Sequence, residues 1–204
     1  MQIIVFGATG KTGRHVVATA LERGHQVTAF GRSVERLDIA DERLELHKGD
    51  VFDRDSVSNA VRGHDAAIIC LGSTGLRDKS TLSAGTKTII EAMIEHEADR
   101  LVVLSAAGVD ESWKQIPWSS RLLFRTMLRN VFADHHAQEA NVKQSPLDWT
   151  IIRAAILKDD PATGSYNATN TGKITKINRA DVATCLIDQL DGPTNSRHAI
   201  SVTA

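Results

Sequence analysis

Three glycines near the start of the chain have the type and spacing needed to hold a phosphate group. They lie in Gly7-Ala8-Thr9-Gly10-Lys11-Thr12-Gly13, directly after the apolar residues 3–6 and at the start of a helical pattern. Glycine lets a strand turn sharply and lets its backbone approach a diphosphate, because no Cβ intervenes. The first turn of the following helix offers unpaired N–H groups and a partial positive charge. Thr9 and Thr12 add hydroxyl donors, and Lys11 can lie along the phosphates.

Two kinds of nucleotide loop use residues of this sort. The P-loop of ATP- and GTP-binding proteins would take Gly10-Lys11-Thr12 as its GK[ST] end, but it would then need glycine at position 5, which is Val5. The spacing is instead GxxGxxG, between a predicted strand and a predicted helix. This context favours the diphosphate of a dinucleotide.

The end of the second predicted strand indicates which dinucleotide is bound. NAD-dependent enzymes place a carboxylate there to accept the ribose 2′-hydroxyl, but this chain reads Ala29-Phe30-Gly31-Arg32-Ser33. Arg32, Ser33 and, one turn later, Arg36 offer two guanidinium groups and a hydroxyl to a 2′-phosphate. We therefore expect NADP(H) as the cofactor; the alternative is that both arginines are solvated surface residues.

Residues at the ends of three further strands complete the predicted cofactor site. Asp50 and Val51 follow the third strand and suit a contact with adenine, although Asp50 suits a turn or a helix cap equally well. Leu71 and Gly72 end the fourth strand, where a glycine lets the central ribose approach the backbone. Ser105 ends the fifth strand, where a doubly wound sheet directs side chains at the nicotinamide.

The apolar pattern predicts elements that bring these strand ends together. Near-continuous apolar strands are typical of a parallel sheet that is buried on both faces, and right-handed crossovers then make the sheet doubly wound. We expect one α/β Rossmann domain over residues 1–204, with a small C-terminal substrate lobe. The predicted strands are 3–6, 26–30, 44–47, 66–71, 101–104, 149–153 and 198–202, and the predicted helices are 12–23, 33–40, 53–61, 81–97, 120–143 and 180–190.

Several features of the second half allow more than one interpretation. Residues 110–120 and 158–173 are predicted as loops, and Asn178 as the cap of the last helix. Trp113 and Trp118 either cover an acceptor or anchor their loop to the core. An apolar stripe at helical spacing either packs in the core or binds a partner; it consists of Leu122, Leu123, Phe124, Met127 and Leu128.

Composition excludes several classes of function. Hydrophobic residues make up 42% of the chain and the net charge is −1, so there is no basic field for nucleic acid or for an acidic membrane. Cys70 and Cys185 lie far apart and form no metal-binding pattern, so we expect no metal. Without a signal peptide or a membrane-spanning run, we expect a cytoplasmic protein that binds no membrane.

The chain resembles the NmrA-like, atypical short-chain dehydrogenases/reductases that bind NAD(P), and among them the flavin and biliverdin reductases. The stretches that carry this resemblance are 4–13, 71–72, 134–135, 147–153 and 179–183. It implies that the glycine loop binds the diphosphate and that Arg77 reaches the cofactor or the substrate. It also implies that Ser105 lies beside the nicotinamide and that His135 is a candidate proton donor. The alternatives are that solvent supplies the proton and that Asp134, His135 and His136 form an exposed helix surface.

A missing tyrosine restricts the chemistry. Many short-chain dehydrogenases use a Tyr-x-x-x-Lys pair as their acid, but the one tyrosine here is Tyr166, in a polar loop, and position 170 is Asn170. We therefore expect an NADPH-dependent reductase that transfers hydride to a planar acceptor, a flavin, a quinone or a tetrapyrrole such as biliverdin. The alternative is a non-catalytic NADP(H)-binding redox sensor of the NmrA type. Either would be a monomer or a weak homodimer.

Overall fold

A computed structural model describes residues 1–73, 75, 80–115, 128–154, 156–171, 173–192 and 195–204. Within these residues, eight strands form one sheet in the order β3-β2-β1-β4-β5-β6-β10-β8. All neighbouring strands are parallel except β8, which is antiparallel to β10. The strands are β1 Gln2–Phe6, β2 Gln26–Gly31, β3 Leu44–Lys48, β4 Ala66–Ile69, β5 Arg100–Ala106, β6 Asp148–Ala154, β8 Asn167–Thr169 and β10 His198–Thr203.

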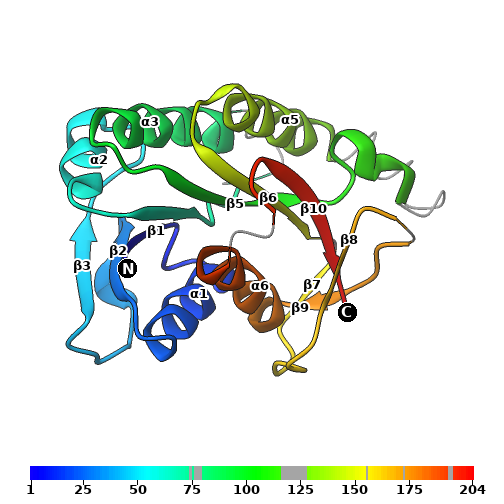
Figure 1. Ribbon diagram of the computed structural model, residues 1–204, viewed down its shortest axis with the longest axis horizontal. Helices are drawn as coiled ribbons and strands as arrows, with labels where there is room; N and C mark the ends of the chain where they lie inside the picture. The colour runs from blue at the N-terminus through cyan, green and yellow to red at the C-terminus, as the bar shows by residue number, and fades with distance from the viewer. Residues whose placement is uncertain (74, 76–79, 116–127, 155, 172, 193–194) are drawn as a thin grey trace.

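Helices cover both faces of this sheet, so the expected doubly wound α/β fold is confirmed (Figure 1). On one face lie α1, Lys11–Glu22, and α6, Arg179–Asp191; on the other lie α2, Arg54–Val61, α3, Thr81–Glu95, and α5, Arg129–Gln144. Each face has its own apolar cluster, with Val16, Val17 and Leu186 in one and Ile89, Met93 and Val142 in the other. None of the described helices is both long enough and apolar enough to cross a bilayer.

The strands form where the sequence is apolar without interruption. Ile3, Ile4, Val5 and Phe6 are all inaccessible to solvent, because their side chains alternate between the two covered faces. The seven predicted strands are present, each within two residues of its predicted ends. The predicted helices 12–23, 53–61, 81–97 and 180–190 are also present, with ends that differ by no more than two residues.

Four local predictions were wrong. Residues 33–40 contain only the 3₁₀ turn Val34–Arg36, and the side chain of Ser33 caps nothing. The predicted loop 110–120 begins with a 3₁₀ helix, Asp110–Gln115, and the predicted loop 158–173 contains β8. Asn178 occupies the N-cap position of α6, but its side chain donates to Pro161 and Asp181 rather than capping the helix. A separate two-stranded sheet pairs β7, Leu157–Lys158, with β9, Ile177–Asn178.

The predicted helix 120–143 is confirmed over its second half, as α5. Trp118, Leu122, Leu123, Phe124 and Met127 lie outside the described residues, so the alternatives for the apolar stripe and for Trp118 stay open. Trp113 lies in the Asp110–Gln115 helix.

Polar groups join α5 to α3. Asp134 is only 1% exposed, and its carboxylate accepts the backbone N–H groups of Leu82 and Ser83 at 2.8 and 3.0 Å and the Ser83 hydroxyl at 2.5 Å. One and two turns later, Gln138 donates to the Thr86 hydroxyl and Asn141 donates to the Ser83 carbonyl. Asp134 therefore caps the first turn of α3 from a different helix and supplies the negative charge that a helix N-terminus favours.

We predict that Asp134→Ala lowers the free energy of unfolding by about 1–3 kcal/mol, because the buried Leu82 N–H loses its acceptor. Urea unfolding of the variant and the wild type measures this difference. The matched control is Glu91→Ala, which removes an exposed carboxylate from α3 and should change stability by no more than about 0.5 kcal/mol. If Asp134→Ala and Glu91→Ala unfolded at the same urea concentration, Asp134 would not stabilise the first turn of α3.

Candidate functional site: a dinucleotide groove and a buried polar network

A groove of about 200 Å³ opens where the strand order reverses. The chain runs from β1 outward to β2 and β3, and then returns to β4 on the other side of β1. Adjacent parallel strands leave a crevice at such a switch point, outside their carboxyl ends. The lining residues lie at or just after the ends of β1, β2, β3 and β4, or at the start of α3. They are Gly7, Thr9, Gly10, Phe30, Gly31, Arg32, Gly49, Asp50, Val51, Phe52, Cys70, Leu71, Gly72 and Thr81.

Two glycines of the loop are required by close backbone approach. Gly7 has φ +79°, and a Cβ there would lie 2.5 Å from the carbonyl oxygen of Cys70. A Cβ on Gly13 would lie 2.2 Å from the carbonyl oxygen of Gly7, where α1 packs against the end of β1. The loop therefore brings bare backbone to the groove and holds the helix directly behind it.

The first turn of α1 suits an anion. Gly10 is its N-cap and carries no side chain that could accept from the helix N–H groups, and the first turn contains no acidic residue. The unpaired N–H groups and the positive end of the helix dipole are left for a ligand. The backbone of Gly7 and Gly10 lines the groove at this point.

Arg32 lines the groove, and its positive charge is not neutralised by a carboxylate among the described residues. It is exposed and forms no ion pair with any of the described residues. A neighbouring arginine that the sequence reasoning missed, Arg14, ties the site together: its guanidinium donates to the carbonyls of Thr9 and Arg36, both at 3.2 Å. Arg14 thus connects the glycine loop to the turn that follows Arg32, and only its place on the exposed face of α1 could have signalled this.

The strand-end residues that were predicted to contact adenine do line the groove. Asp50 also forms a turn, because its carboxylate accepts the Phe52 N–H at 3.1 Å. Both interpretations of Asp50 are therefore compatible with its position. Phe52, which is 53% exposed, and Thr81 were missed, although their places after β3 and at the start of α3 could have indicated them.

Five of the remaining predicted cofactor residues do not line the groove. Lys11 instead forms a 2.8 Å ion pair with Asp159, which also pairs with Arg179. Thr12 is buried in α1. Gly13, Ser33 and Arg36 are also absent from its lining. Arg77 lies outside the described residues.

Ser105 belongs to a buried polar network at the carboxyl end of β5. Its hydroxyl donates a hydrogen bond to Glu139 Oε1 at 2.8 Å. Arg153 binds both oxygens of the same carboxylate, with Nε 3.0 Å from Oε1 and Nη2 2.7 Å from Oε2. Glu139 is fully buried, and Lys143 approaches it to 3.2 Å. Burial by itself would lower the pKa of Arg153, but Glu139 and Glu111 outweigh this effect and hold the pKa above its ordinary value. Because the Ser105 proton goes to Glu139, Ser105 Oγ can only accept a further hydrogen bond.

His135 lies one turn before Glu139 and is half-buried. Its Nδ1 is 3.3 Å from Gln138 Oε1, and the Gln138 amide nitrogen donates to Thr86, so the histidine proton belongs on Nδ1. Burial lowers the pKa of His135, against the smaller raising effects of Gln138, Glu139 and Asp134. At neutral pH the ring is therefore mostly neutral, with Nε2 as an acceptor.

Two other reactive groups are unavailable for chemistry. Burial raises the pKa of the Cys70 thiol to about 12, so it remains protonated, as expected for an inert core cysteine. Tyr166 donates its hydroxyl to Asp188 at 2.7 Å, and burial, followed by that hydrogen bond, raises its pKa. Within the described part of the chain, no group of three or more His, Cys, Asp or Glu side chains could hold a metal ion.

The family model described as NAD(P)H-binding matches residues 7–193. An uncharacterized chloroplastic protein of Arabidopsis thaliana is 27% identical over 175 residues, which cover 80% of this chain and 62% of that protein. This chain thus spans about three-fifths of the length of that relative.

Solved structures share the fold. A short-chain dehydrogenase/reductase of Veillonella parvula in complex with NADP has a TM-score of 0.83 and 20% identity, covering 100% of this chain and 94% of the other. The anaerobilin reductase ChuY of Escherichia coli O157:H7 has a TM-score of 0.82 and 22% identity, covering 100% and 97%.

We predict that Gly13→Ala lowers the free energy of unfolding by about 1–3 kcal/mol, as overpacking does, and weakens dinucleotide binding at least tenfold, because Gly7 must move. Thermal unfolding and calorimetric titration with NADPH measure the two effects. Gly192→Ala is the control, because a Cβ there meets no atom within 4 Å. Wild-type stability and affinity in Gly13→Ala would show that the close approach is unimportant.

Proposed function

This chain belongs to the NAD(P)H-binding family, and from that premise we propose that it is an NADPH-dependent reductase of the atypical short-chain type, which passes hydride to a planar acceptor such as a flavin, a quinone or a tetrapyrrole. The observation that carries the proposal is the groove at the β1–β4 switch point, with Arg32 on it and no carboxylate at the end of β2.

The residues present fit NADPH. At Gly7 and Gly13 a Cβ would collide with neighbouring backbone, so the loop can be this tight only with glycine, as a loop whose backbone meets a diphosphate requires. The first-turn N–H groups of α1 then bind the diphosphate, and the Arg32 guanidinium binds the 2′-phosphate by charge-assisted hydrogen bonds. Asp50, Val51 and Phe52 would hold the adenine, and Leu71 and Gly72 the central ribose.

NADPH, when bound, supplies the hydride. Ser105 presents an acceptor oxygen to the nicotinamide end, since its proton is held by Glu139. Arg153 keeps Glu139 oriented, so it is a positioning residue for Ser105. The described residues contain no Tyr-x-x-x-Lys pair, and the Tyr166 phenol is bonded to Asp188, so the proposed reaction uses no phenolic acid.

A turnover measurement tests the proposal and separates it from the alternative of a non-catalytic NADP(H) sensor. Purified protein with NADPH and excess FMN, or a quinone, should oxidise NADPH faster than the same mixture without protein. Tight binding of NADPH without added turnover with any of these acceptors would support the sensor and refute the reductase.

We predict that Arg32→Ala weakens NADPH binding roughly 10- to 100-fold and leaves NADH binding unchanged. The reason is that a hydrogen bond to a charged group contributes about 1.5–3 kcal/mol, and 1.4 kcal/mol is a factor of ten. Fluorescence titrations with both dinucleotides measure the ratio. Arg62→Ala, which removes an exposed arginine away from the groove, should leave both affinities unchanged. If Arg32→Ala weakened NADPH and NADH binding equally, Arg32 would not be the residue that binds the 2′-phosphate.

We also predict that kcat with FMN rises as the pH falls below about 6.5, the ordinary pKa of histidine. Burial lowers the pKa of His135, so the imidazolium that could donate a proton becomes populated only at lower pH. Steady-state rates, corrected for the reaction in free solution, give the pH profile. His135→Gln should flatten the rise, whereas His136→Gln, on the exposed side of α5, should retain it. If kcat depended on pH in the same way in His135→Gln and in the wild type, the proton would come from solvent rather than from His135.

A further inference from the structure

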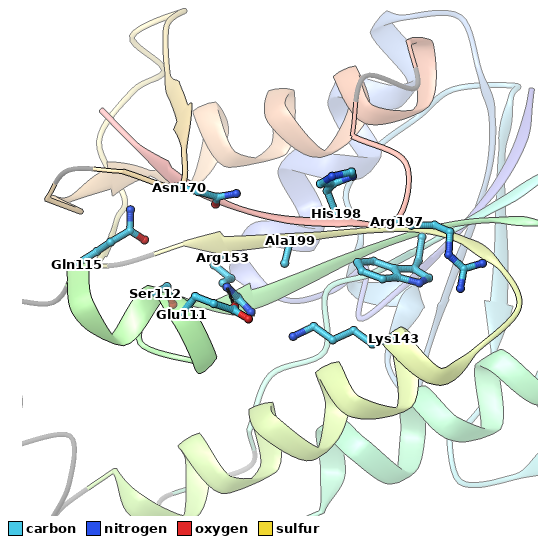
Figure 2. Close-up of a pocket in the computed structure, with 10 residues that line it drawn as sticks. Glu111, Ser112, Gln115, Lys143, Arg153, Asn170, Arg197, His198 and Ala199 are labelled. Atoms are coloured by element: carbon cyan, nitrogen blue, oxygen red, sulfur yellow. Dashed lines mark hydrogen bonds and ion pairs between the residues drawn. The ribbon is translucent and has the colours of Figure 1, made fainter.

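A second cavity, of about 310 Å³, lies on the α5 side of the sheet, over β6 and the start of β10 (Figure 2). It shares no lining residue with the dinucleotide groove. Figure 2 shows Gln115 and Asn170 at one end, Arg197 at the other and Ala199 between them, with Lys143 reaching in from α5. The Asp110–Gln115 helix closes one side of the cavity through Glu111, Ser112 and Gln115.

Two buried donors on this cavity lack an acceptor in the structure. Trp149 Nε1 and Gln115 Nε2 form no hydrogen bond with the described residues, although Trp149 and Gln115 are 7% and 8% exposed. The other end of the Gln115 amide is occupied, because its oxygen accepts the Ser201 hydroxyl at 2.8 Å. Buried polar groups are nearly always hydrogen-bonded, so two unpartnered donors on one cavity indicate a ligand that brings acceptors.

The charges around the cavity specify the kind of acceptor. Lys143 and Arg153 are neutralised by Asp110, Glu111 and Glu139. Arg197 is different: its guanidinium makes only hydrogen bonds of 3.3 and 3.4 Å to the carbonyls of Pro146 and Ser145, and it meets no carboxylate in the described part of the chain. Arg197 is thus the cation whose charge is still uncompensated.

The backbone holds Arg197 beside the indole. Its N–H donates to the Trp149 carbonyl at 2.7 Å, and its φ of +56° is in the left-handed region, which is uncommon for a residue other than glycine. The indole ring of Trp149 and the methyl group of Ala199 give the same cavity an apolar surface. Donors, an uncompensated cation and an apolar surface therefore occur together.

We propose that this cavity binds a small carboxylate with an apolar body, such as an aromatic monocarboxylate. Trp149 Nε1–H donates to the carboxylate, Arg197 beside it supplies the compensating charge, and the apolar body packs against the indole and Ala199. Gln115, at the opposite end of the cavity, does not contact the carboxylate. The volume is at the lower end of the range for small-molecule sites. Because the two sites share no lining residue, we expect the carboxylate and the dinucleotide to bind at the same time.

The test follows the indole N–H signal of Trp149 in ¹H–¹⁵N correlation spectra while benzoate is added. Trp149→Phe identifies this signal among those of the three tryptophans. We expect a saturable shift of the Trp149 signal that persists with excess NADPH, and no comparable shift with benzamide, which has the same shape but no charge. Arg197→Gln should weaken benzoate at least tenfold, whereas Arg62→Gln, away from the cavity, should not.

NADPH binding guards against a folding defect, and a second variant serves as the control. Arg197→Gln should bind NADPH as the wild type does, which shows that it is folded. Gln115→Met removes the donor at the opposite end of the cavity and leaves every charge, so both benzoate and NADPH should bind to it as to the wild type. The proposal is overturned if benzoate leaves the Trp149 signal unmoved, if benzamide shifts it equally, if NADPH abolishes the shift, or if Arg197→Gln binds benzoate as the wild type does.

Discussion

The buried ion pair between Glu139 and Arg153 is the interaction on which the functional half of the molecule depends. Its side chains are 0% and 2% exposed, and it joins α5 to β6. Removing two charges from water costs several kcal/mol for each ion, and the cost is recovered only when the geometry is good and every remaining polar group has a partner. Both requirements are met, because the contact is bidentate and Ser105, Lys143 and Glu111 complete the hydrogen bonds.

This pair also lies between Ser105, which we propose faces the nicotinamide, and the second cavity. Toward the carboxyl end of β5, Glu139 accepts the Ser105 proton; on the other side, Arg153 and Lys143 line the second cavity. Removing one partner of such a buried pair typically lowers the free energy of unfolding of the protein by about 3–5 kcal/mol, because the other charge remains buried without compensation. Substitutions in the pair are therefore poor tests of either site. Arg32 and Arg197 are better positions, because both are exposed and neither forms an ion pair within the described residues.

The sequence could predict what depends on apolar patterns and glycine spacing, and not what depends on buried polar contacts. The strands were predicted because Ile3 to Phe6 and their counterparts are apolar without interruption. The glycine loop was predicted because backbone packs so closely on Gly7 and Gly13 that no Cβ fits at either. The inner face of α5 was missed, since Asp134, Gln138 and Glu139 are buried there by hydrogen bonds. Hydrophobic periodicity does not detect such a face. Likewise, Ser33 suggested a helix start, but no amphipathic stretch follows to stabilise more than one turn.

The network also restricts what the site can do with protons. The Ser105 hydroxyl donates its hydrogen bond to Glu139, and the Tyr166 hydroxyl donates to Asp188. Neutral His135 donates its N–H to Gln138. At neutral pH, where His135 is not protonated, each candidate donor is thus committed to an acceptor inside the protein. A carbonyl substrate needs a donor at its oxygen as hydride arrives, and these residues offer it acceptors instead. A flavin or quinone takes up its proton readily from water once it is reduced, so a site that supplies orientation and few protons suits such an acceptor better than a sugar or an alcohol precursor.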